Sequence, residues 1–170
     1  MTDSVSGGPR KAGSFERVRA FLTERGLEAG LLAFDDRSTK TCELAAEAVG
    51  CEVGQIVKSL VFVADSRPLL ALVAGDRRGD TAAIGALMGA SAVRFADAET
   101  VRSATGYAIG GVSPYDLPDE LTVLVDDSLE RFETVYTAAG TPASMVRIDR
   151  AVLFELVGGQ VARISRQSAS

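Results

Sequence analysis

The sequence predicts a single α/β domain in which helices pack on one mixed, largely antiparallel and curved β-sheet. A chain of 170 residues suits one domain with a hydrophobic core and is short for two. Short apolar runs rich in β-branched residues come in pairs joined by turns, as the strands of β-hairpins do; the clearest pairs are 56–64 with 69–74, and 134–138 with 144–148. Segments with helical periodicity or capping residues separate these pairs, which favours helices packed on the sheet.

Capping residues and turn residues give the order of the remaining elements. Residues 1–13 are rich in Ser and Gly and are expected to form a disordered tail, which leaves 14–165 as the folded domain. Further strands are expected at 31–34, 91–95 and 121–125. Segment 75–79 is predicted to be a loop, 126–132 a turn or short helix, and 160–170 a polar tail. Five helices are expected, each opened by a residue able to cap a helix N-terminus: Ser14, Thr41, Asp80, Asp97 and Asp149.

The composition excludes several classes of site. The chain has no His, so a Ser-His-Asp triad, a Cys-His dyad and the common His-containing zinc sites cannot be built. Its two cysteines indicate no disulfide framework, so a cytoplasmic protein without a metal is expected. No apolar run is long enough to span a bilayer. The net charge of −5 and pI of about 4.8 argue against a surface coated with basic residues for nucleic acid, but they leave room for a local basic patch.

The strand predicted at 56–64, IVKSLVFVA, contains one charged residue, Lys58. Side chains alternate along a strand, so Lys58 points the same way as Leu60 and Phe62, toward a core. Lysine is rarely buried without a partner. Lys58 therefore either reaches water from the open end of the strand or serves a site. In a site it would hold an anionic or carbonyl group as an ammonium, or lose its proton and form a Schiff base.

A glycine-rich stretch at 106–114, GYAIGGVSP, is the second candidate for chemistry. Glycine lets backbone N–H groups approach a ligand, and proline fixes the exit of a turn. The loop is therefore a candidate donor of N–H groups to a carbonyl or phosphate oxygen, unless it is only a bend between elements. Its spacing is neither that of a P-loop nor that of a dinucleotide-binding fingerprint. The sequence shows no packing role for the pair Gly110 and Gly111.

Two charged clusters have structural explanations that compete with functional ones. Asp126 and Asp127 are candidate acid–base partners, but the same residues suit a turn that caps a short helix. Arg77 and Arg78 are expected to be solvated charges, with contact to a polyanion as the alternative.

Together these stretches resemble the free-standing aminoacyl-tRNA editing domains, the YbaK-type group that includes prolyl-tRNA editing and Cys-tRNA(Pro) deacylase proteins. The resemblance runs from about 31 to 156. It rests on the order and spacing of AAEAVG, GQIVKSLVF, LLALVAGD, GYAIGGVSP and VYTAAGTPASMVRI. The family shares a lysine, here Lys58, and a Gly-x-x-x-Pro loop, here Gly110 to Pro114.

The resemblance implies the editing-domain fold and an aminoacyl-tRNA deacylase, which hydrolyses the ester between a wrong amino acid and the terminal ribose of tRNA. The implied substrate is tRNA(Pro) carrying a small wrong amino acid such as Ala or Cys. The implied partners are the tRNA acceptor end and an aminoacyl-tRNA synthetase, with no metal, organic cofactor or membrane. An ester is an activated bond, so positioning and donor hydrogen bonds can suffice without a triad. The implied site has Lys58 as catalytic residue and, as substrate-binding residues, Thr41, Ser59, Gly110, Gly111, Ser113 and Pro114.

Several points stay open. Thr41 and Ser59 would equally serve as a helix cap and a strand hydroxyl satisfied by the backbone. Some branches of the family carry a histidine near the pocket, which this chain lacks. The cysteine-editing branch is expected to have a Ser-Gly-Gly turn and a later Asp. In this chain the stretch 138–140, AAG, takes the place of the turn, and a position at or near Met145 takes the place of the Asp. Small apolar residues favour a small uncharged amino acid such as alanine. Two alternative functions are a non-catalytic tRNA-end or synthetase-binding module and a Schiff-base enzyme that uses Lys58.

Overall fold

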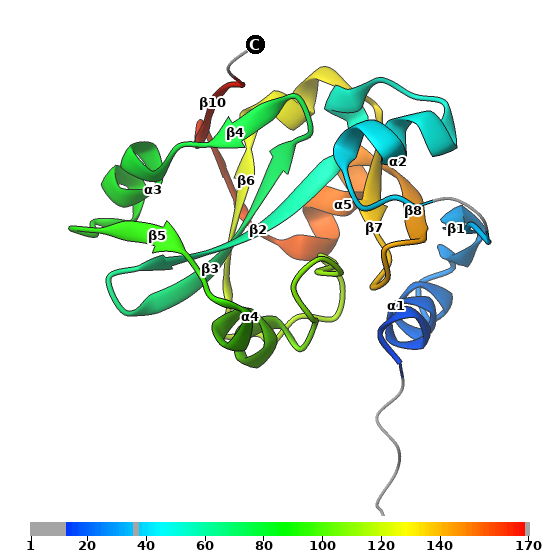
Figure 1. The fold of residues 1–170 in the computed structure, drawn as a ribbon, viewed down its shortest axis with the longest axis horizontal. Coiled ribbons are helices and arrows are strands. Elements are labelled where there is room, and N and C mark those ends of the chain that lie inside the picture. The colour runs from blue at the N-terminus through cyan, green and yellow to red at the C-terminus, as the bar shows by residue number, and fades with distance from the viewer. Residues whose placement is uncertain (1–12, 36–37, 169–170) are drawn as a thin grey trace, which may run out of the picture.

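A five-stranded mixed sheet with the order β5-β2-β3-β6-β9 forms the centre of the molecule (Figure 1). The computed structural model describes residues 13–35 and 38–168. The central hairpin pairs β2 (Val57–Ala64) with β3 (Arg67–Ala74) in antiparallel register. β5 (Val93–Phe95) lies antiparallel along the other edge of β2, whereas β6 (Thr122–Asp126) runs parallel to β3, and β9 (Gln160–Ala162) runs parallel to β6.

Two smaller sheets flank the central one. A three-stranded antiparallel sheet has the order β1 (Leu31–Ala33), β8 (Ser144–Asp149) and β7 (Thr134–Ala138). An isolated parallel bridge between Ile56 and Tyr136 joins it to the start of β2. β4 (Arg77–Gly79) and β10 (Ser165–Gln167) form a separate antiparallel ribbon, in which the C-terminal part of the described chain returns to the turn after β3.

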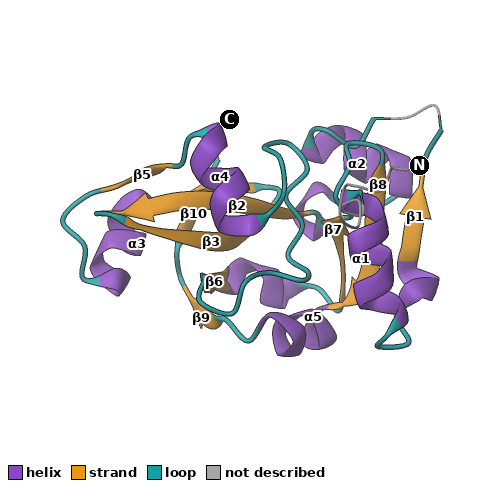
Figure 2. Ribbon diagram, turned by 90° about the horizontal axis from the view of Figure 1, so that it is seen from below, coloured by secondary structure: helices purple, strands orange, loops and turns teal. Residues whose placement is uncertain are grey.

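Helices cover both faces of the central sheet, as Figure 2 shows. Alternation along β2 separates the two faces: Val57, Val61 and Val63 belong to the larger hydrophobic cluster, and Phe62 packs with Ile84 in a smaller one. The helices of the described chain are α1 (Ser14–Thr23), α2 (Cys42–Val49), α3 (Thr81–Met88), α4 (Ala98–Thr105) and α5 (Arg150–Val157), with 3-10 turns at Glu28–Gly30, Val53–Gln55 and Asp127–Arg131. None of these helices has the length and hydropathy needed to traverse a bilayer.

The predicted fold class, a mixed and largely antiparallel α/β domain, is confirmed, but the strands form three sheets rather than the single sheet that was predicted. Other differences lie where strands are short. Segment 75–79, predicted to be a loop, contains β4, and the predicted polar tail contains β9 and β10. Three-residue strands that pair with distant segments carry no local signal, so propensity alone misses them. Asp149 precedes α5 without a side-chain cap bond, and α1 is preceded by Gly13 rather than capped by Ser14. The tail predicted to be disordered lies outside the described residues, apart from Gly13.

Candidate functional site

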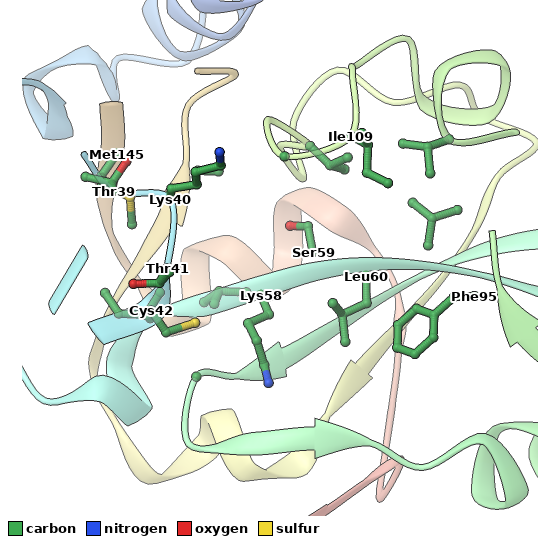
Figure 3. Close-up of a pocket in the computed structure, with 18 of the residues that line it drawn as sticks. Thr39, Lys40, Thr41, Cys42, Lys58, Ser59, Leu60, Phe95, Ile109 and Met145 are labelled. Carbon is green, nitrogen blue, oxygen red and sulfur yellow. The ribbon is translucent and has the colours of Figure 1, made fainter. Parts of the chain in front are cut away.

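A cavity of about 630 Å³ lies where the first half of β2, the N-terminus of α2 and the 106–114 loop meet (Figure 3). Its volume is within the range of small-molecule sites. Four of the seven predicted site residues line it: Thr41, Lys58, Ser59 and Gly110. The structure therefore brings the lysine strand and the glycine-rich loop to one space. Other residues that line the cavity are Lys40, Cys42, Phe95, Ile109, Ala138 and Met145.

The edge of β2 is open toward this cavity. β5 covers β2 only from Phe62 to Ala64, beyond the residues that line the cavity. The amide of Gly75, next to β3, donates to the carbonyl of Ile56 at 2.7 Å, and the amide of Ala96, on the opposite edge, donates to the carbonyl of Val61 at 3.0 Å. Because bonding alternates along an antiparallel strand, the N–H and C=O groups of Ser59 point to the open edge. The edge thus offers a main-chain donor to a ligand.

Lys58 and Ser59 leave β2 on opposite sides (Figure 3). The half-buried Lys58 directs its Nζ toward the start of β4, where it donates a hydrogen bond to the carbonyl oxygen of Arg77. Within residues 13–35 and 38–168, Lys58 forms no ion pair. A neutral carbonyl leaves the ammonium charge uncompensated, so the structure does not support a buried structural ion pair.

The polar groups beside Lys58 have different partners. The Thr41 hydroxyl accepts the Leu44 amide at 3.1 Å and so caps α2, although Thr41 also lines the cavity. The buried Ser59 Oγ has no hydrogen-bond partner in the described part of the chain, and Figure 3 shows it on the side of the loop that carries Ile109. Burial raises the pKa of the Cys42 thiol, and the nearby charge of Lys58 offsets this shift only in part. The Cys42 thiol is therefore neutral at neutral pH.

Only part of the predicted glycine-rich loop reaches the cavity. Gly110 has φ of 90°, and a Cβ there would meet nothing within 4 Å. Gly111, Ser113 and Pro114 are buried and do not line the cavity. A Cβ on Gly111 would lie 2.9 Å from the carbonyl oxygen of Gly140. Gly111 therefore has a packing role that the sequence did not reveal, because the backbone of the β7–β8 turn approaches it directly.

An ion pair holds the turn that directly precedes Arg77, the partner of Lys58. Arg131 donates two hydrogen bonds to Asp76, at 2.9 and 2.7 Å. These hydrogen bonds are the main reason why the pKa of Asp76 lies below its usual value. Asp76 directly precedes Arg77, whose carbonyl receives the Lys58 amine. The bidentate pair thus anchors the residue before Arg77, and Arg77 itself pairs with Gln167 of β10.

Asp126 and Asp127, the acid–base candidates, do not line the cavity. Asp126 is fully buried and accepts hydrogen bonds from the Ser128 and Ile164 amides and the Ser165 hydroxyl. Asp127 lies 3.8 Å from Arg163. The structural explanation, a capped short helix, is confirmed for this pair.

Sequence reasoning did not identify several residues that line the cavity, among them Lys40, Phe95 and Ile109. Lys40 adds a second cation, and Phe95 and Ile109 place large apolar side chains there that are 63% and 62% exposed. The Phe95 ring packs on the buried Phe62 ring, with centroids 4.5 Å apart. Isolated apolar residues in short elements look like core residues in a sequence, so only their exposure in the fold reveals them. Across the described residues, no group of three or more His, Cys, Asp or Glu side chains is arranged to hold a metal ion.

Comparison with known proteins identifies the family. Residues 36–156 match the family model described as an aminoacyl-tRNA editing domain. The Bacillus subtilis protein YwhH is 34% identical over 79% of this chain and 85% of its own length. An Enterococcus faecalis protein, provisionally named Cys-tRNA(Pro)/Cys-tRNA(Cys) deacylase EbsC, is 25% identical over 74% of this chain and 77% of its own. A crystal structure provisionally described as a trans-editing enzyme for prolyl tRNA synthetase has a TM-score of 0.81 and 40% identity, covering 92% of this chain and 99% of that one. The resemblance found in the sequence is thereby confirmed, and the chain belongs to the aminoacyl-tRNA editing domain family.

Proposed function

We propose that this chain is a deacylase that acts in trans on tRNA(Pro) carrying a small wrong amino acid, with alanine as the first candidate. The observation that carries the proposal is the single cavity shared by Lys58, the open edge of β2 at Ser59 and the loop at Gly110. Membership of the editing family supports the reaction class. The similarity to a crystal structure provisionally described as a trans-editing enzyme for prolyl tRNA synthetase supports the choice of tRNA.

The open edge of β2 suits the reacting ester. Its carbonyl oxygen would accept the Ser59 N–H, which stabilises the negative charge that develops on that oxygen. A water molecule attacks the carbonyl carbon, the bond to the ribose oxygen breaks, and a proton originating from the water ends on that oxygen. We propose that the Ser59 hydroxyl, which is buried and has no partner in the described residues, orients this water. The products are the free amino acid and a tRNA with its terminal hydroxyl restored.

The two lysines of the cavity suit the nucleotide end. Lys58 gives up the carbonyl of Arg77 when the substrate enters and holds a ribose hydroxyl or phosphate oxygen instead. Lys40 supplies a second charge from the segment before α2. A phosphate oxygen carries negative charge, so it attracts the Lys58 ammonium more strongly than the neutral carbonyl of Arg77 does.

Ala138 and Met145 line the cavity at the positions where the cysteine-editing branch is expected to carry polar residues. An apolar wall offers nothing to a polar side chain and favours a small uncharged amino acid. Alanine and cysteine differ by one sulfur atom, and an apolar wall separates substrates that differ by a group as small as one methylene by only about 1–3 kcal/mol. We therefore expect a graded preference rather than absolute selection between alanine and cysteine.

A panel of charged tRNAs tests this proposal. Ala-tRNA(Pro), Cys-tRNA(Pro) and Pro-tRNA(Pro), each labelled on the amino acid, are incubated with the protein, and the release of label is followed. We expect the fastest release from Ala-tRNA(Pro) and the slowest from Pro-tRNA(Pro). Binding of all three without release of any label would instead indicate a non-catalytic module.

Exhaustive chelation should leave deacylation unchanged. The chain has no His, and its described residues offer no cluster of metal ligands, so the reaction is expected to need only hydrogen bonds and position. The rate is compared before and after dialysis against EDTA, with the tRNA refolded in magnesium beforehand so that its own folding does not interfere. A loss of activity that zinc restores would contradict the metal-free site.

A further inference from the structure

The ribbon formed by β4 and β10 carries three arginines next to the cavity. Arg78 lies directly opposite Arg166, and Arg77 lies opposite Gln167. Residues directly opposite each other share one face of a ribbon, so Arg78 and Arg166 project together, and both are exposed. The third pair of the ribbon, Gly79 and Ser165, is more buried: a Cβ on Gly79 would lie 2.8 Å from the Phe62 ring.

These arginines lack ion-pair partners in the described residues. Like charges directly opposite each other destabilise a strand pair. In the ranges 13–35 and 38–168, none of the three arginines of the ribbon forms an ion pair. The carboxylates nearest in sequence are engaged elsewhere: Asp76 binds Arg131, and Asp80 caps α3. A chain of net charge −5 thus keeps a local positive face that costs stability.

The ribbon is continuous with the cavity at two points. The carbonyl of Arg77 accepts the Lys58 amine, and Ser168, directly after β10, lines the cavity. We propose that Arg78 and Arg166 bind the phosphate backbone of the RNA whose terminal residue enters the cavity. This inference rests on the proposed function. Arginine suits it because its planar fork binds phosphate through two hydrogen bonds.

Binding of an uncharged RNA hairpin with the acceptor-stem sequence and a CCA end tests the ribbon independently of hydrolysis. The variant Arg78→Gln/Arg166→Gln is compared with Arg67→Gln/Arg19→Gln, which removes two exposed arginines elsewhere. We expect the ribbon variant to bind the hairpin at least about tenfold more weakly than the wild type. The slope of the logarithm of the binding constant against the logarithm of the salt concentration should be smaller in magnitude by roughly 2, because each lost phosphate contact contributes about 0.9. The control should stay within about twofold of the wild type.

Equal binding by the wild type and the ribbon variant would overturn the proposal, as would an equal loss in the control or no binding by the wild type. If hairpin binding depends on the ribbon but the protein deacylates none of the charged tRNAs, the proposed function is contradicted and the ribbon proposal stands. If the wild type does deacylate, the ribbon variant should raise KM for charged tRNA and leave kcat unchanged.

A second, independent observation concerns Arg17 of α1, which bridges both ends of the 106–114 loop. Its guanidinium donates to the Thr105 carbonyl at 3.1 Å, before the loop, and to the carbonyl of Asp116, after it. Its Nε also binds the Asp116 carboxylate at 2.9 Å. The guanidinium carbon lies 4.2 Å from the centroid of the Tyr107 ring.

Two further contacts tie the same loop to its surroundings. The Tyr107 hydroxyl donates to the carbonyl of Tyr115 at 2.6 Å, which joins the two ends of the loop directly. Gly140 lies between α1 and the loop: a Cβ there would be 2.7 Å from the carbonyl oxygen of Ser14, and its own carbonyl oxygen packs on Gly111. Helix α1 therefore contacts the loop through Arg17 and supports it through Gly140.

We infer that Arg17 is a positioning residue, which holds the loop so that Gly110 faces the cavity. The family model matches residues 36–156 and so does not include α1. Only the expected fall in kcat rests on the proposed function. The order of the loop is measured by amide hydrogen exchange, which needs no substrate.

The test compares Arg17→Ala with Arg25→Ala. Arg25 lies just beyond the end of α1 and also stacks on an aromatic ring, that of Phe21, but its hydrogen bond and ion pair stay within that segment. We expect faster hydrogen exchange of amides 107–113 in Arg17→Ala and a fall in kcat of at least about tenfold, because small misplacements of catalytic groups are costly. Arg25→Ala should resemble the wild type in both.

Free guanidinium at low millimolar concentration should restore part of the lost kcat of Arg17→Ala, an effect that a damaged core would not show. If Arg17→Ala does not fold, Asp116→Asn keeps the shape and removes only the charge partner, and it should also speed exchange in the loop. Unchanged exchange in the loop of either folded variant would overturn the inference.

Discussion

Lys58→Ala is expected to lower deacylation at least about a hundredfold while leaving the free energy of unfolding nearly unchanged. In the described residues the Lys58 amine has no anionic partner, and its hydrogen bond goes to the neutral carbonyl of Arg77. Removing the side chain therefore leaves no buried charge unpaired, a loss that would cost roughly 3–5 kcal/mol. Under the proposed function the partner of Lys58 arrives with the substrate, so we expect catalysis to be affected and folding to be unchanged.

Lys58→Arg is the sharper control for this prediction. Arginine keeps the charge but replaces a compact ammonium with a wide planar fork, which a confined site should not accept. Thermal unfolding and single-turnover deacylation are measured for the wild type and both variants. A stable Lys58→Ala protein with normal turnover would remove Lys58 from the site and leave it as a lysine whose amine merely reaches solvent.

Gly111→Val is expected to abolish deacylation and, unlike Lys58→Ala, to destabilise the protein. A Cβ on Gly111 would lie 2.9 Å from the Gly140 carbonyl oxygen, so one of the two backbones must move. Overpacking of this kind costs about 1–3 kcal/mol. The displaced segment is the one that holds Gly110 at the cavity, so the loss of turnover should be much larger than the loss of stability explains.

The smaller change Gly111→Ala allows a matched comparison with Gly13→Ala. A Cβ on Gly13 would meet nothing within 4 Å, so this control adds the same methyl group without a clash. Chemical denaturation and single-turnover rates are recorded for both. Normal activity in a folded Gly111→Ala protein would show that the loop tolerates displacement and that its place at the cavity does not matter for the reaction.

Much of the fold was predictable because its signals are local. The hairpin of β2 and β3 follows from two apolar runs joined by a turn, and the starts of α2, α3 and α4 follow from Thr41, Asp80 and Asp97, each of which accepts a hydrogen bond from a first-turn amide. The ribbon of β4 and β10 was missed because each strand has three residues and its partner is far away in sequence. Such pairs form only once the central sheet has brought the segments together.

The candidate site was predictable in part. A single lysine in an apolar strand is conspicuous, and it does line the cavity. The sequence could not show that the Lys58 amine and the Ser59 hydroxyl lie on opposite sides of β2, or that the strand edge there is uncovered. It could not separate Gly110, which lines the cavity, from Gly111, which packs on Gly140, because the two neighbours differ only in what the fold places beside them.

The most direct test is a structure with a stable analogue in which an amide replaces the ester of 3′-alanyl-adenosine. We predict that the analogue occupies the cavity, with its carbonyl oxygen at the Ser59 N–H, its alanyl methyl beside Ala138 and Met145, and the Lys58 amine moved from the Arg77 carbonyl to the nucleoside. An analogue bound elsewhere, for example in the hollow of about 600 Å³ lined by Arg17, Phe21 and Asp116, with the Lys58–Arg77 hydrogen bond intact, would contradict the account.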